Sequence, residues 1–331
     1  FKWFKLAAEQ GDAQSQSYLS GMYENGIGVQ QDSKKSLKWM TLAAEQGDNQ
    51  AQFNLGKAYE SGDGVPENHK EAVKWYRLAV KKGNRGAQSN LGVMYSKGKG
   101  VLKDKKEAVR LFRLSAEQGF SRGQYNLGLQ YQGGDGVKQD FEEATKWFKL
   151  SAEQGFNLAQ FELGQVYRKG EGVQQDFEKA FKWYRLAAEQ GHIYSQRSLG
   201  NMYSFGEGVL KDKKEAVKWF KLASEQGDGQ SQYELGSMFG NGEGVLKNDK
   251  EAFKWFKLAA KQGNKYAQHN LGVMYANGEG ILKDDKEAVR WWKFAAENGF
   301  ADSQINLGLF YANGKGVTQD FVLAYMWLDI A

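Results

Sequence analysis

The feature that constrains this chain most is an internal repeat of 36 residues, which runs from end to end without an insertion. A leucine recurs in one register nine times, at positions 19, 55, 91, 127, 163, 199, 235, 271 and 307. A tryptophan holds a second register at positions 3, 39, 75, 147, 183, 219, 255, 291 and 327, with Leu111 as its one substitute. A period of this length is typical of proteins built from repeated supersecondary units.

The glycines follow the same period. Four glycine positions in the repeat account for 35 of the 41 glycines, so their number reflects architecture and not a flexible linker. Two of them form a G-x-G-V turn, as at Gly62–Val65, where a positive φ suits a helix C-cap and a tight turn. Another lies inside a helix at Gly56, where it costs about 1 kcal/mol relative to alanine. We therefore expect a packing reason there, either the close approach of a neighbouring helix or a tryptophan ring.

Each repeat is predicted to form two helices joined by that turn. Residues 49–60 of the second repeat show apolar side chains at helical spacing, and we call this first helix of a repeat helix A. Helix B begins at Asn68, and Asn68 with Glu71 forms a capping pair in which each side chain satisfies a free amide. Helix pairs this short cannot bury their apolar faces alone, so the sequence predicts an all-α solenoid of stacked pairs.

The composition excludes several kinds of site. The chain has no cysteine, which rules out disulfides, thiolate metal sites and cysteine nucleophiles. Its three histidines, His69, His192 and His269, lie at unlike registers without metal-ligand spacing. A helix and not a strand precedes each G-x-G turn, which argues against a nucleotide loop. We expect no enzyme activity, cofactor, metal or small-molecule substrate, and no apolar run is long enough to form a transmembrane segment.

The pattern A-Q-x-x-L-G-x-x-Y-x-x-G-x-G-V, followed by D-x-x-x-A-x-x-W-x-x-x-A-A-x-x-G, resembles the Sel1-like repeat, a relative of the tetratricopeptide repeat. The resemblance covers essentially the whole chain and implies a right-handed superhelix of nine repeats with helices A on its concave side. Residues 1–12 are interpreted as a partial helix B, 13–300 as eight complete repeats and 301–331 as a ninth, truncated in helix B. The chain is therefore expected to be a segment of a longer protein.

The resemblance also implies an adaptor or scaffold for protein complexes. It favours a bacterial periplasm or envelope location, and the cytoplasm stays open. Alignment with the tetratricopeptide repeat places partner-facing positions two and five residues on either side of the register leucine. Their mixture of aromatic, aliphatic, amide and arginine side chains is typical of a peptide-binding groove, with intramolecular packing as the alternative. The candidate partner-binding residues are Phe53, Lys57, Tyr125, Leu129, Phe161, Gln165, Arg168, Tyr194, Arg197, Tyr233, Tyr266, His269, Val273, Ile305 and Leu309.

Two rows of basic residues run along helix B, as at Lys146 and Lys149, and could bind an anionic surface or nucleic acid. Glutamates such as Glu153 follow the second row, so a solvated face of mixed charge is the preferred interpretation. The net charge of +5 requires no acidic partner. The predicted function is a non-catalytic scaffold that binds a partner protein or peptide. A structural subunit of a stable assembly is the main alternative, and an anionic-surface or nucleic-acid binder is the weaker one.

Overall fold

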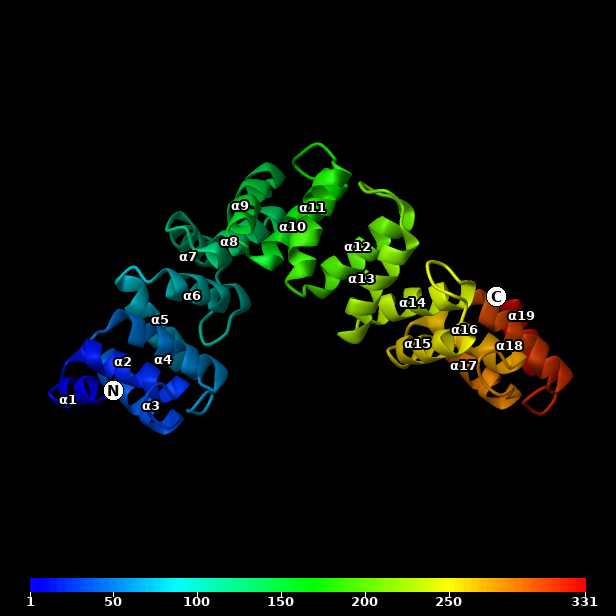
Figure 1. Ribbon diagram of the computed structural model, residues 1–331, viewed down its shortest axis with the longest axis horizontal. Helices are drawn as coiled ribbons and strands as arrows, with labels where there is room; N and C mark the ends of the chain where they lie inside the picture. The colour runs from blue at the N-terminus through cyan, green and yellow to red at the C-terminus, as the bar shows by residue number, and fades with distance from the viewer. The chain divides into compact units, whose positions relative to one another are not determined.

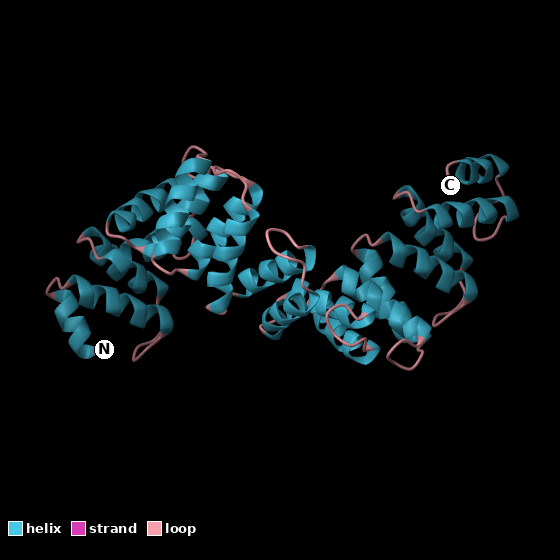
Figure 2. Ribbon diagram, turned by 90° about the horizontal axis from the view of Figure 1, so that it is seen from above, coloured by secondary structure: helices cyan, strands magenta, loops and turns pink.

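The computed structural model describes all 331 residues and consists of helices and turns, without a strand (Figure 2). The helices are α1 (Lys2–Glu9), α2 (Ala13–Asn25), α3 (Ser33–Glu45), α4 (Asn49–Ser61), α5 (His69–Lys81), α6 (Arg85–Lys97), α7 (Lys105–Glu117), α8 (Ser121–Gly133), α9 (Phe141–Glu153), α10 (Asn157–Lys169), α11 (Phe177–Glu189), α12 (Ile193–Phe205), α13 (Lys213–Glu225), α14 (Gly229–Asn241), α15 (Asp249–Lys261), α16 (Lys265–Asn277), α17 (Asp285–Glu297), α18 (Ala301–Asn313) and α19 (Phe321–Asp329). The predicted all-α repeat fold is thereby confirmed.

Even-numbered helices are helices A, and odd-numbered helices are helices B. The chain divides into two compact units, Phe1–Gln175 and Asp176–Ala331. Within each unit, every helix packs against the next one along the chain (Figure 1). The boundary between them along the chain falls in the turn between α10 and α11, where the sequence keeps its repeat pattern.

The turn between the two helices of a repeat doubles back on helix A. Asn68 caps α5 as predicted, because its Oδ1 accepts from the amides of Lys70 (3.1 Å) and Glu71 (3.2 Å). The reciprocal half of the predicted capping pair is wrong. The Asn68 amide donates instead to the carbonyl of Tyr59 near the end of α4 (2.8 Å), and Glu71 pairs with Lys74 (3.2 Å). The same backbone bond recurs at Asp104, Asp140, Asp212 and Asp284, so the turn itself satisfies the amide.

The glycine inside helix A lies directly beneath an aromatic ring of helix B. A Cβ atom on Gly56 would stand 2.6 Å from the Tyr76 ring, and one on Gly128 would stand 2.7 Å from the Phe148 ring. The ring belongs to the residue that follows the tryptophan register. Close approach of a neighbouring helix is therefore confirmed as the packing reason, and a tryptophan ring is the neighbour at Gly272, where it belongs to Trp292.

The hydrophobic core passes from one repeat to the next. One cluster combines Tyr76 of α5, Leu91 and Met94 of α6 and Leu111 of α7, all of them buried. Leu111 takes the place of the register tryptophan and is fully buried there. Each helix pair therefore completes its core only against the following pair, which is the physical reason for the stacking.

A buried glutamine near the start of helix A joins three helices. In α8, Gln124 donates to the carbonyl of Ala116 at the end of α7 (3.3 Å) and accepts from Gln154 after α9 (2.7 Å). The same side-chain pair recurs between residues 16 and 46, 88 and 118, 196 and 226, and 232 and 262. It fails at Gln268, where the shorter Asn298 takes the place of the second glutamine and donates to the carbonyl of Phe294 (2.8 Å). The Oε1 atom of Gln268 is therefore buried without a hydrogen-bond donor.

We expect Asn298→Gln to raise the free energy of unfolding of the second unit by about 0.5–1.5 kcal/mol, because the longer amide would supply the missing donor to Gln268. Urea unfolding followed by tryptophan fluorescence measures the change. The matched control is Gln262→Asn, which removes the donor to Gln232 and should lower the stability by about 1–3 kcal/mol. Equal stability of Asn298→Gln and the parent chain would contradict the prediction.

Candidate functional site

An open groove crosses helices A of the first unit. It has a volume of about 620 Å³ and extends from α4 across α6 and α8 to the start of α10. We call it the α4–α10 groove, and its lining consists of Lys57, Glu60, Ser61, Asn90, Val93, Arg122, Tyr125, Asn126, Phe156, Asn157 and Leu158. The face of helices A therefore carries a concavity that is long enough to contact four successive repeats.

One wall of the groove is apolar and aromatic. The Tyr125 ring meets the Phe156 ring edge to face, with centroids 5.3 Å apart, and also packs on Phe148 at 6.1 Å. Leu158 adds an aliphatic side chain that is 38% exposed. Burial, with a smaller contribution from the Glu162 charge, raises the pKa of Tyr125 to about 12, so the wall stays uncharged at neutral pH.

The opposite end of the groove is polar and hydrogen-bonded. The Tyr76 hydroxyl donates to Glu60 Oε2 (2.5 Å) and accepts from the Asn90 amide (3.0 Å). Burial and the bond to Glu60 raise the pKa of Tyr76 far above its usual range, so the hydroxyl keeps its proton. The amide of Asn126 donates to Ser89 Oγ (3.1 Å). These bonds hold the side chains that border the groove in place. One of them engages Glu60, the only carboxylate that lines the groove.

Two cations line the groove without an ionic partner. Lys57 and Arg122 are both exposed, and neither makes an ion pair within the structure. The Lys57 ammonium lies 5.9 Å from the centroid of the Phe53 ring, a contact that supplies no opposite charge. The groove therefore joins an apolar wall to two unpaired positive charges.

Phenylalanine at the N-cap of helix A is a feature that the sequence analysis missed. Asp, Asn or His caps most helices A through its side chain, whereas Phe120, Phe156 and Phe300 make no such bond. Their rings cover the preceding helix A instead, as when Phe300 packs on His269 with centroids 4.9 Å apart. The sequence does carry a signal for this feature, because these three repeats lack a polar residue at the N-cap position of helix A.

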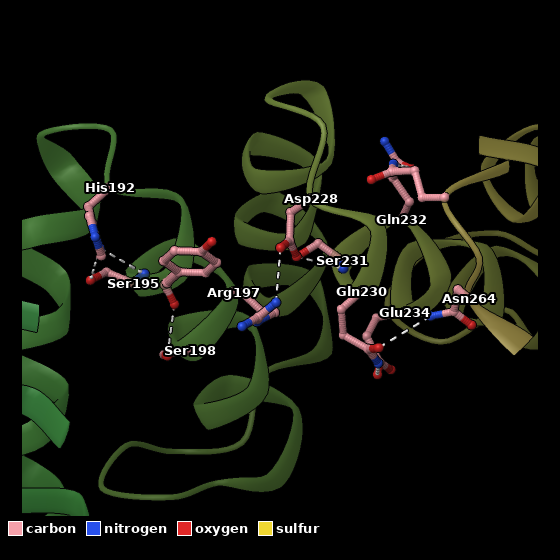
Figure 3. Close-up of polar contacts among 12 residues, drawn as sticks. His192, Ser195, Arg197, Ser198, Asp228, Gln230, Ser231, Gln232, Glu234 and Asn264 are labelled. Atoms are coloured by element: carbon pink, nitrogen blue, oxygen red, sulfur yellow. Dashed lines mark hydrogen bonds and ion pairs between the residues drawn. The ribbon is translucent and has the colours of Figure 1, made fainter. Parts of the chain in front are cut away.

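In other repeats of the second unit the residue at this N-cap position makes polar contacts, as Asp228 does (Figure 3). Arg197 pairs with the largely buried Asp228 (2.9 Å), and Asp228 in turn caps α14 by accepting from the Ser231 amide (2.8 Å). The guanidinium also lies 5.2 Å from the ring centroid of Tyr194, which is 52% exposed. The predicted partner-binding residue Arg197 is therefore engaged within the chain.

Of the other predicted partner-binding residues in the second unit, some pack against neighbouring side chains and some are exposed. Tyr233 packs on Phe256 and on Tyr266, with centroids 5.9 and 5.7 Å apart. Val273 lines a cavity of about 300 Å³ that also contacts Phe256 and Asn270. Ile305 and Leu309 lie exposed on α18.

The first unit likewise brings only some of the predicted residues together. Lys57 and Tyr125 line the α4–α10 groove. Phe53 fills the space above Gly86 and packs on Tyr76 at 6.0 Å, so intramolecular packing accounts for it. Leu129, Phe161, Gln165 and Arg168 are half-buried on α8 and α10, outside the lining of the groove.

Two histidines of the second unit act as neutral hydrogen-bonding groups. The Nδ1 atom of His192 accepts from the Ser195 amide (3.3 Å) and caps α12, and His269 Nδ1 lies 2.9 Å from Ser303 Oγ. Burial lowers the pKa of both side chains, against a smaller opposing effect of Asp302 on His269.

We expect the second unit to lose stability as the pH falls below about 6.5, the ordinary histidine pKa. The unfolded chain then binds protons that the folded histidines take up only at lower pH, so acid favours unfolding. His192→Asn with His269→Gln should reduce this slope, because Asn caps a helix without titrating. Unfolding free energies at pH 8 and pH 5 measure the effect, and an unchanged difference in the double variant would contradict it.

Neighbouring glutamates pair with many of the residues in the basic rows of helix B. Residues of the first row pair with a glutamate three positions earlier, at 2.7 Å for Arg110 with Glu107 and 2.9 Å for Lys146 with Glu143. The second row pairs with a glutamate four positions later, as at Lys149 and Glu153 (3.9 Å). Exposed pairs like these contribute little to stability, but they place negative charge beside the positive residues of both rows. Each row is therefore a face of mixed charge.

The structure contains no three His, Asp or Glu side chains arranged to hold a metal ion. None of its helices combines the length and the apolar character that crossing a membrane would need.

Stacked pairs of short helices that share a core from repeat to repeat define the α-solenoid class of repeat proteins. The Sel1 repeat matches the sequence at residues 1–12, 13–48, 49–84, 86–120, 121–156, 157–192, 193–228, 229–264, 265–300 and 301–331. The chain belongs to the Sel1 repeat family. Proteins of this family are generally non-catalytic and mediate protein–protein interactions.

Two solved structures of bacterial proteins are similar over nearly the whole chain. One is c5321, described as a protective antigen of uropathogenic Escherichia coli strains with an SLR fold. It is 34% identical with a TM-score of 0.62, over 99% of this chain and 86% of that one. The other is a Sel1 repeat protein from Oxalobacter formigenes, 32% identical with a TM-score of 0.67, over 93% of this chain and 89% of that one. No curated protein sequence matches the chain.

Proposed function

We propose that this chain is a non-catalytic scaffold that holds a segment of a partner protein in the α4–α10 groove. The observation that supports the proposal is the groove itself, in which an apolar wall of Tyr125, Phe156 and Leu158 adjoins two cations without ionic partners. Protein interfaces use such a combination, with aromatic anchors for affinity and polar groups around them for orientation. Membership of a family that generally mediates protein–protein interactions supports it further.

Site-specific photo-crosslinking of the intact chain in its native extract tests this proposal. A photoreactive amino acid is placed at Val93 or Asn126 in the groove, and at the exposed helix B positions Lys106 and Glu142 as controls. We expect one recurring protein from the groove positions, identified by mass spectrometry, and a lower yield when Tyr125→Ala is added. Circular dichroism of the variant establishes that its helices are intact. Crosslinks from the helix B positions alone would contradict the proposal.

A second candidate function is a structural subunit of a stable assembly that uses the loops before helix B. Four leucines at one position of the repeat, Leu102, Leu210, Leu246 and Leu282, are 87–91% exposed. Exposed large apolar side chains that form a contiguous patch are typical of protein contact surfaces. A photoreactive residue at Leu210 or Leu246 tests this alternative, because abundant crosslinks there and none from the groove would favour the assembly subunit.

A further inference from the structure

We infer that the α4–α10 groove selects an extended acidic segment that carries one bulky apolar side chain. The inference rests on the proposed function and adds the chemistry of the partner. The charges that line the groove, the apolar wall beside them and the length of the groove support it.

The charge of the groove favours an acidic ligand. Its lining holds Lys57 and Arg122 against a single carboxylate, Glu60, which already accepts the Tyr76 hydroxyl. By contrast, the helix B lysines that serve as controls below have ionic partners, since Lys74 pairs with Glu71 and Lys146 with Glu143. An Asp or Glu side chain entering the groove would therefore meet cations that no protein group compensates, and charge-assisted hydrogen bonds would form.

The wall of the groove requires an apolar anchor next to those acidic side chains. Arg122 and Tyr125 are three residues apart on α8, so they lie on one face of the helix. A ligand that places a Leu or Phe side chain against Tyr125 and Phe156 therefore brings its neighbouring residue close to the Arg122 guanidinium. Such a rigid aromatic pair offers contact area at little conformational cost.

The length of the groove favours an extended segment over a compact small molecule. Its volume of about 620 Å³ is within the range of small-molecule sites. The groove extends, however, from Lys57 on α4 to Leu158 on α10. Only a ligand that crosses the intervening helices can contact both cations and the apolar wall.

Fluorescence anisotropy with the full chain and labelled, end-blocked ten-residue peptides tests the inference. One peptide carries a central Leu flanked by Asp and Glu, a second replaces the acids by Asn and Gln, and a third replaces them by Lys. We expect the acidic peptide to bind at least about tenfold more tightly than the neutral one at low salt, with the difference shrinking as salt is added. Replacing the central Leu by Ser should weaken binding by about tenfold as well.

Charge variants locate the preference. Lys57→Glu with Arg122→Glu should weaken the acidic peptide about tenfold or more and favour the basic one, whereas Lys57→Arg with Arg122→Lys should retain it. The matched control is Lys74→Glu with Lys146→Glu, which makes the same change in net charge on helix B. An equal loss in this control, or equal affinity for acidic and neutral peptides, would overturn the inference.

The two proposals fail in different ways. If all three peptides bind and Tyr125→Ala weakens them equally, the acidic preference is wrong and the groove function stands. If no peptide binds while the photoreactive groove positions still capture a partner, the inference is wrong and the proposed function again stands. If no peptide binds and the photoreactive groove positions capture no partner, both the inference and the proposed function are wrong.

Discussion

Gly280→Ala is expected to lower the free energy of unfolding of the second unit by about 3–5 kcal/mol, through backbone strain and overpacking together. Gly280 has a φ of +70° in the turn after α16. A Cβ atom there would stand 2.2 Å from the carbonyl oxygen of Asp249, the first residue of α15 in the preceding repeat. Backbone at the end of a packed helix cannot move aside as a flexible side chain does. The substitution therefore disturbs the contact between repeats.

The control for this prediction is Gly64→Ala at the same position of another repeat. Gly64 has a φ of +74°, but the nearest atom to its Cβ would be the Ser33 carbonyl oxygen, 4.0 Å away. Only the left-handed conformation then opposes the alanine, so the cost should be about 1–2 kcal/mol. Urea unfolding and amide hydrogen exchange of both variants measure the two costs. Similar losses would show that backbone conformation, and not the contact between repeats, decides the need for glycine.

Gly236→Ala should lower the stability of the second unit by about 1–3 kcal/mol, despite the better helix propensity of alanine. A Cβ atom on Gly236 would stand 2.8 Å from the ring of Phe256, which is almost fully buried. Relief of this contact requires the ring to leave its packing on Tyr233 or α14 and α15 to separate. Gly240→Ala on the same helix is the matched control.

The nearest atom to a Cβ on Gly240 would be 3.7 Å away, at the Ala252 methyl, which is an ordinary contact. Gly240→Ala should therefore raise the stability by about 0.5–1 kcal/mol, because alanine loses less conformational freedom on helix formation. Thermal and urea unfolding of the two variants should thus move in opposite directions. Movement in the same direction would contradict the packing explanation.

The candidate groove could be predicted only in part. A position two residues before the register leucine was expected to face a partner, and Tyr125 does line the groove. The same position holds Phe53, which fills the space above Gly86, and Arg197, which pairs with Asp228. What that side chain contacts within the chain depends on the residues 31 to 33 positions later, at the start of the next helix A. One repeat considered alone does not contain that neighbour.

The all-helical fold, the length of the repeat and the boundaries of its helices could be predicted from the amino acids alone, because these depend on local periodicity, caps and positive-φ glycines. The tertiary structure is needed to explain the remaining glycines, since the rings and carbonyls that exclude a Cβ belong to other helices, as Phe256 does for Gly236. It also decided the buried glutamine pairs and the placing of Phe156 against Tyr125. Those contacts join residues about 30 positions apart, and stacking of one repeat on the next brings them together.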